Sequence, residues 1–277
     1  MMPIQASEVV VRLQALPAFP AIVTRILETL KDERAALELL EQHLQSDPVI
    51  SARILSAANR LIRHSGREPV GDVHTAVSYL GLNRVHDVVV STSLLDFVKN
   101  SHCTSVFWER SLAVGLCAQE LAGLVDENPD HALVAGLLHG VGILWLQVCH
   151  PHEYQQVLIE RQLHDSDLAQ TERTLLGLDH LEIGGLLAEH WDLPGDIVQA
   201  IAGYRTPPHG ALPPLVAVVH LATVICSGLD LPFQPDNEVR HLAPQALRAL
   251  GEGWEDKMPD LLGRVEVRFA QSRTLLK

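Results

Sequence analysis

The stretch that decides the fold is Ala135-Gly136-Leu137-Leu138-His139-Gly140-Val141-Gly142-Ile143-Leu144. It places His139 in the middle of apolar residues, a pattern typical of a buried helix. A buried imidazole must be hydrogen-bonded or bound to a ligand, because an unpaired buried polar group costs about 1–3 kcal/mol. On these residues alone, we favour a hydrogen-bonded core histidine over a ligand-binding one. Close helix contacts are expected at the glycines Gly136, Gly140, Gly142 and Gly184.

This stretch lies within a long run without a formal charge, residues 131–151. The run approaches the ~20 apolar residues that span a bilayer. It also carries His131, His139 and His150 together with three glycines. We therefore expect a buried core helix and no membrane span. Residues 1–11 lack the basic start and long apolar run of a signal peptide, so the sequence predicts a cytoplasmic protein.

Outside this run, nearly every segment follows the 3.6-residue period of an amphipathic helix, and none alternates convincingly with period two. The sequence predicts an all-α fold. A polar break at residues 99–105 divides it into two packed helical lobes, residues 1–100 and residues 101–277. The second lobe includes a C-terminal helical extension. Asp47 and Pro48 predict a helix start, with the aspartate as the N-cap and the proline at the first helical position.

The composition excludes several classes of function. The chain has 277 residues with 21 Lys and Arg against 34 Asp and Glu, a net charge of −13, which argues against a nucleic-acid partner. The sequence contains no P-loop, no Gly-x-Ser-x-Gly and no zinc-protease spacing among its 15 histidines. Four widely spaced cysteines, expected to be reduced, are Cys103, Cys117, Cys149 and Cys226.

Leu137-Leu138-His139-Gly140-Val141-Gly142 resembles the Leu-Leu-His-Asp-Ile-Gly signature of the HD superfamily of metal-dependent phosphohydrolases. It is more closely similar to the HDOD family, the HD-related output domains of bacterial signalling proteins. The resemblance extends from about Leu16 to Pro207 and implies that the second lobe is HD-like. Further matching segments are Leu16–Pro20, Ser46–Pro48, Ala58-Asn59, Ala76–Gly81, Phe107–Val114, Pro151–Tyr154, Asp179–Gly184 and Trp191–Pro194.

The resemblance also implies where a metal site would lie. At those positions this sequence departs from the active enzymes of the HD superfamily. Such enzymes use a histidine, a His-Asp pair and a later aspartate to hold metal ions that activate water. The corresponding positions here are Arg110, His139 with Gly140, and Thr223. A His-His pair often found in the family is replaced by Tyr204-Arg205, while His180 is retained. Hard metal ions need carboxylate oxygens, so the resemblance implies no metal and no cofactor.

We therefore expect a non-catalytic regulatory module that acts in signal transduction through protein contacts or a small anionic ligand. Two alternatives remain: an HD-type phosphohydrolase with non-standard metal ligands, and a structural adaptor without any ligand. The expected partners are unidentified signalling proteins. The candidate residues of the degenerate pocket are Arg110, His139, Gly140, Glu172, His180, Tyr204, Arg205 and Thr223.

Arg110 is the most informative of these candidates. Helical spacing places it on the stripe that contains Phe107, Val114 and Cys117 and that faces the core. A guanidinium on that face needs acceptors, because it stays charged. Either its aliphatic stem carries the charge out to solvent, or the charge points inward and pairs with Glu172 or an anionic ligand.

Overall fold

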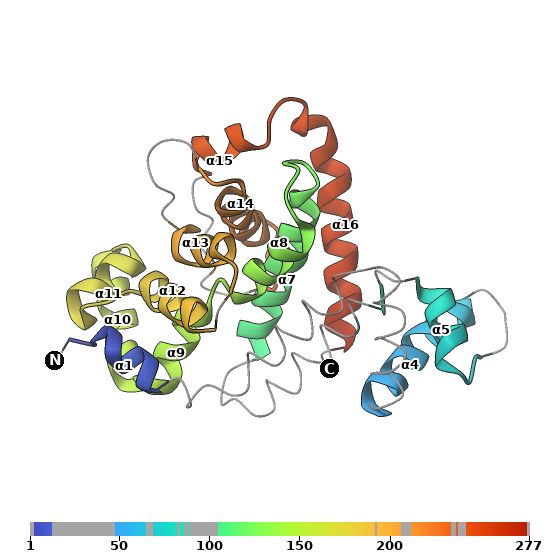
Figure 1. The fold of residues 1–277 in the computed structure, drawn as a ribbon, viewed down its shortest axis with the longest axis horizontal. Coiled ribbons are helices and arrows are strands. Elements are labelled where there is room, and N and C mark those ends of the chain that lie inside the picture. Colours follow the sequence, from blue (N-terminus) through green and yellow to red (C-terminus); the bar gives the residue numbers. More distant parts are fainter. Residues whose placement is uncertain are drawn as a thin grey trace. The chain divides into compact units, whose positions relative to one another are not determined.

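The computed structural model describes residues 3–12, 48–64, 69–81, 84–85, 88, 105–191, 193–205, 212–233, 237 and 242–275. Within these ranges every regular element is a helix, which confirms the all-α prediction (Figure 1). Cys117, Cys149 and Cys226 are free thiols. The segments Leu16–Pro20 and Ser46-Asp47, as well as Cys103 and Pro207, lie outside the described residues.

The chain divides into two compact units. The larger unit comprises residues 1–17 and 101–269, and the smaller unit comprises residues 18–100 and 270–277. The sequence assigned residues 1–100 to one lobe and residues 101–277 to the other, so both ends of the chain differ from that expectation. The first 17 residues belong to the larger unit because α1 (Ala6–Val11) packs on α12 (His180–His190).

The larger unit also holds the helices from α7 to α16. In chain order they are α7 (Ser105–Ala122), α8 (Pro129–Leu138), α9 (Val141–Cys149), α10 (Pro151–His164), α11 (Leu168–Leu176), α13 (Gly195–Gly203), α14 (Pro214–Gly228), α15 (Pro244–Ala249) and α16 (Trp254–Leu275), with α12 between α11 and α13. The residues of α16 beyond 269 belong to the smaller unit.

Local sequence explains where many of these helices begin. Proline stands in the first turn of α8, α10, α14 and α15, where its missing N–H removes no intrahelical hydrogen bond. The helix α12 begins with a capping box: the Asp179 side chain accepts from the Glu182 amide at 2.8 Å. The Glu182 carboxylate in turn accepts from the Asp179 amide at 3.0 Å.

Glycines let the central helices of the larger unit touch at their backbones. A Cβ on Gly136 of α8 would lie 2.7 Å from Gly115 Cα of α7. A Cβ on Gly142 of α9 would lie 1.9 Å from the His180 carbonyl oxygen at the start of α12. Cβ atoms on Gly140 and Gly184 would lie 3.1 Å and 2.9 Å from side chains of neighbouring helices. The predicted close contacts at all four glycines are confirmed.

The apolar run that resembled a membrane span is folded into this core. Among the described residues, the stretch Pro129–Cys149 is long and apolar enough to cross a bilayer by length and composition alone. It is divided into α8 and α9 at His139 and Gly140, and 78% of its most apolar window is buried inside the fold. Such burial is what a pair of core helices shows.

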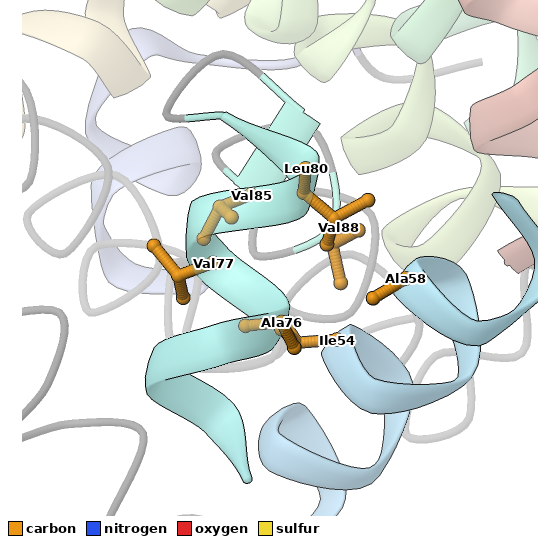
Figure 2. Packing of buried hydrophobic residues seen from close by; sticks show 7 residues of the cluster. All are labelled: Ile54, Ala58, Ala76, Val77, Leu80, Val85 and Val88. Carbon is orange, nitrogen blue, oxygen red and sulfur yellow. The ribbon is translucent and has the colours of Figure 1, made fainter. Parts of the chain in front are cut away.

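The smaller unit is described by two helices, α4 (Pro48–His64) and α5 (Val73–Leu80), which pack on each other. The described part of α4 begins at Pro48, and the predicted N-cap, Asp47, lies outside the described residues. Figure 2 shows the buried cluster formed by these two helices and the residues that follow α5: Ile54, Ala58, Ala76, Val77, Leu80, Val85 and Val88. Asn59 fixes the chain before α5, because its side chain donates to the Val70 carbonyl at 3.0 Å and accepts from the Val70 amide at 2.8 Å.

Candidate functional site

A cavity of about 260 Å³ lies in the larger unit, lined by residues of α7, α9, α10, α11 and α14 and of the loops beside them. It contains most of the candidate residues. Those that line it are Arg110, His139, Gly140, Tyr204, Arg205 and Thr223. The two other candidates, Glu172 and His180, are not among the lining residues and form a buried pair of their own.

Arg110 points inward and binds α14. Its Nη2 donates to the Thr223 carbonyl at 2.9 Å and to the Ser227 hydroxyl at 2.5 Å. Burial lowers the pKa of Arg110, and the group nonetheless remains charged at neutral pH. The structure therefore contradicts the alternative in which the guanidinium reaches solvent. It also contradicts a pair with Glu172, because that carboxylate binds His180 instead.

His139 ends α8 as a buried, hydrogen-bonded histidine, as predicted. Its Nδ1 lies 2.6 Å from the Gly136 carbonyl, which can only accept, so Nδ1 carries the hydrogen. Burial lowers the pKa of His139 to about 3, with nearby Arg110 adding to the effect. The imidazole is therefore neutral, and it meets the Tyr204 ring edge to face at 5.1 Å between centroids.

Gly140 stands at the N-cap of α9, directly after His139. A Cβ there would lie 3.1 Å from Phe107 Cε2, so the ring of Phe107 reaches the place that a side chain at this position would use. The carboxylate of the HD signature is absent at this position, and an aromatic ring from α7 lies beside it.

Glu172 of α11 and His180 of α12 are both fully buried. The Glu172 Oε2 accepts from the His180 backbone amide at 2.9 Å and lies 2.5 Å from His180 Nδ1. The His180 ring centroid lies 6.3 Å from that of Tyr204, so the pair is next to the cavity wall. Within the described structure, His180 Nε2 and Glu172 Oε1 have no hydrogen-bond partner.

Tyr204 and Arg205 follow α13 and form one wall of the cavity. Burial raises the pKa of the Tyr204 phenol to about 12, so the phenol is neutral. The Arg205 side chain is 11% exposed, and its Nη2 lies 3.6 Å from Asp167 Oδ2. In the described part of the chain, the Arg205 Nε and Nη2 atoms are buried without a hydrogen-bond partner.

Sequence reasoning missed several residues of this wall. His220 donates through Nδ1 to the Tyr204 carbonyl at 2.8 Å and accepts through Nε2 from the Ala243 amide at 3.1 Å. Ser227 could have been found, because it follows Thr223 by one helical turn on the same face of α14. Other lining residues that the sequence did not single out are Ser111, Ile143, Arg161, Leu168, Val224 and Asn237.

The residues present do not fit the metal centre of an active HD enzyme. Arg110 and Gly140 supply no ligand where a histidine and an aspartate are needed, and both nitrogens of His220 are engaged. In the part of the chain that the structure describes, no group of three His, Cys, Asp or Glu side chains could hold a metal ion. The surviving imidazoles are those of His139 and His180. The carboxylate beside His180, Glu172, is bound to the ring and the backbone amide of that histidine, and the charge of Arg110 would repel a cation.

The sequence profile of the HDOD domain matches residues 16–207. The chain belongs to the HDOD family. Among solved structures, it is similar to an HDOD domain protein of unknown function from Geobacter sulfurreducens, at 27% identity with a TM-score of 0.68. That alignment covers 94% of this chain and 99% of the other.

Two further solved structures extend the comparison. A Shewanella amazonensis protein, provisionally named a phosphohydrolase, is 25% identical with a TM-score of 0.68, over 97% of this chain and 98% of that one. A Marinobacter aquaeolei protein, provisionally named a signal transduction protein, is 23% identical with a TM-score of 0.71. That alignment covers 96% of this chain and 60% of the other, and the similarity shows the fold alone.

A curated relative of unknown function comes from Treponema pallidum. It is 22% identical over 236 residues, which cover 81% of this chain. The matched region is 45% of the relative, so this chain spans less than half the length of the curated relative that it matches.

Proposed function

We propose that this HDOD protein is a non-catalytic regulatory module in signal transduction, acting in the cytoplasm on separate signalling proteins. The observation that carries the proposal is the hydrogen bond from Arg110 to the Thr223 carbonyl. It joins two positions that correspond to metal ligands in active HD enzymes. A fixed, partly buried positive charge there repels a divalent cation more strongly than a fully solvated one would.

The relatives agree with a signalling role but do not decide it. The Marinobacter protein carries a signalling name and the Shewanella protein a phosphohydrolase name, and both have the same fold as this chain. The phosphohydrolase is therefore the second candidate, favoured by the name of a relative that matches this chain over almost its whole length. The net charge of −13 supports protein or small-molecule partners rather than nucleic acid.

The test measures metal content and hydrolysis on the same purified protein. We expect substoichiometric Mn, Fe, Ni and Zn, and no release of phosphate from nucleotides, cyclic dinucleotides or phenyl phosphate when any of these metals or Mg²⁺ is added. Stoichiometric metal together with turnover would overturn the proposal. A Gly140→Asp variant is the informative companion: it restores the His-Asp pair, yet we expect no metal, because Arg110 and Thr223 are unchanged.

A further inference from the structure

We propose that the cavity beside Arg110 binds a small organic dianion, with a phosphate or dicarboxylate head at the arginines and an apolar body against α7, α9 and α11. The inference rests on the proposed function in one respect: the cavity must be a binding site and not a hydrolytic one.

The charge of the cavity wall is opposite to that of the whole chain. The lining includes three arginines, Arg110, Arg161 and Arg205, and no aspartate or glutamate among the described residues. The protein as a whole carries a net charge of −13. His139 and His220 add no charge of their own, since burial lowers the pKa of both and favours the neutral imidazole, so the positive charge of the lining comes from the arginines. An anion would therefore meet positive charge at this one site.

Arg205 provides donors that the protein leaves unused. Its Nε and Nη2 are buried without a hydrogen-bond partner in the described structure. Asp167 forms an ion pair with Nη2 at 3.6 Å, which is longer than a hydrogen bond, and its own side chain is 49% exposed. Burying a cation without acceptors is unfavourable, and a bound carboxylate or phosphate would supply them.

Arg110 is held in place with part of its guanidinium uncommitted. Both of its hydrogen bonds to α14 use the same nitrogen, Nη2. The Nε and Nη1 donors are not needed for these bonds and belong to a side chain that lines the cavity. A guanidinium fixed before binding loses little conformational entropy when an anion arrives.

A buried hydroxyl adds a further donor at the wall. Ser111 is 1% exposed, lines the cavity one residue after Arg110, and its Oγ has no hydrogen-bond partner in the described structure. Unsatisfied buried polar atoms are uncommon in folded proteins. Two residues with such donors, Arg205 and Ser111, line the same cavity, which points to a ligand that accepts their hydrogen bonds.

The remaining lining sets the size and the body of the ligand. Phe107, Ile143, Leu168 and Val224 supply the apolar part of the lining. The volume of about 260 Å³ is near the lower end of the roughly 300–1,000 Å³ typical of small-molecule sites. A compact ring or short chain that bears the dianion would fit, whereas a large cofactor would not.

The experiment compares four probes by calorimetry and thermal unfolding of the full chain: phenyl phosphate, phthalate, inorganic phosphate and benzyl alcohol. We expect at least one of the two aromatic dianions to bind and to raise Tm. Inorganic phosphate should bind at least tenfold more weakly than that dianion, and benzyl alcohol should not bind detectably. A preference between phenyl phosphate and phthalate tells a phosphate head from a dicarboxylate head.

Variants locate the site. Arg205→Gln should weaken binding at least tenfold, whereas Arg248→Gln, which removes the same charge from an exposed position on α15, should leave it unchanged. Val224→Phe, which keeps every charge but fills the cavity, should abolish binding and provides a second test if Arg205→Gln does not fold. No binding of either aromatic dianion, equal binding of benzyl alcohol, or equal losses in the two arginine variants would overturn the inference.

The same samples separate this inference from the proposed function. Binding of phenyl phosphate without release of phenol supports both proposals. Absence of binding together with absence of metal and turnover overturns the anion site and leaves the non-catalytic role standing. Release of phenol overturns the non-catalytic role itself, and with it the proposed dianion site beside Arg110.

Discussion

At the scale of single residues, Arg110 shows how one substitution changes the chemistry of a site. Truncation to alanine removes two hydrogen bonds to α14 and leaves the Thr223 carbonyl with the Ser227 hydroxyl as its side-chain donor. We expect Arg110→Ala to lower the free energy of unfolding by about 1–3 kcal/mol, the cost of losing hydrogen bonds to buried polar groups. The loss should not be larger, because no buried carboxylate loses its partner. Urea denaturation measures the change.

The matched variant for Arg110 is methionine, which keeps most of the stem without the charge. Methionine retains the packing of the aliphatic stem that alanine loses, so Arg110→Met should be less destabilising than Arg110→Ala. An alanine variant within about 0.5 kcal/mol of the parent, as at an ordinary surface site, would contradict the described hydrogen bonds.

His139 gives the fold a pH dependence of predictable sign. Its pKa falls from 6.5 to about 3 in the folded protein. Between these two pH values the unfolded chain binds the proton more tightly than the folded protein does. The contribution of neutral His139 to the free energy of unfolding is therefore complete above pH 6.5 and is lost as the pH falls toward 3. The slope from this one group is at most about 1.4 kcal/mol per pH unit.

Glutamine at position 139 keeps a donor for the Gly136 carbonyl but does not titrate. We expect the loss of stability between pH 7 and pH 5, measured by urea denaturation, to be smaller in His139→Gln than in the parent. Equal losses in the two proteins would show that the imidazole does not stay neutral when buried.

At the scale of elements, the contact between α9 and α12 tolerates no side chain at Gly142. A Cβ there would meet the backbone of His180 at 1.9 Å and the Gly184 amide nitrogen at 2.9 Å, and backbone cannot rotate away as a side chain can. Gly142→Ala should therefore destabilise the larger unit by about 3 kcal/mol or more, at or above the usual range for overpacking. Gly195→Ala is the control, since its Cβ would meet nothing within 4 Å at the start of α13. Equal Tm values for the two variants would refute the packing described.

The sequence predicted these elements better than it predicted their contacts. Proline and the capping residues set the start of α8 and α12 locally, so the helices and the close glycines could be inferred. The partner of Arg110 could not, because Ser227 lies 117 residues away and only the folded packing of α7 on α14 brings them together. For the same reason the pair of Arg110 with Glu172, one of the alternatives that the sequence left open, is wrong, because the start of α12 places His180 beside that carboxylate.

At the scale of the whole molecule, the larger unit is assembled from distant parts of the chain. The Ile4 amide donates to the Leu176 carbonyl at 2.7 Å, and Glu8 lies 3.2 Å from His150 Nε2. The short apolar pattern of residues 1–11 gives no sign of these partners, which explains why the sequence placed this segment with the first lobe. The segment of residues 3–12 therefore adds long-range contacts to the unit that carries the cavity.

The helix α1 offers a matched pair of valines to test that attachment. Val9 is fully buried against the larger unit, whereas Val11 on the same helix is 77% exposed. Val9→Ala removes buried methyl groups and should lower the free energy of unfolding by about 1–2 kcal/mol, while Val11→Ala should change it by less than about 0.5 kcal/mol. The readout is the unfolding transition followed by tryptophan fluorescence, since Trp108 and Trp145 are buried in this unit. Equal unfolding of the two variants would contradict the packing of α1 on the larger unit. It would favour the division that the sequence predicted, with the boundary between the lobes at residues 99–105.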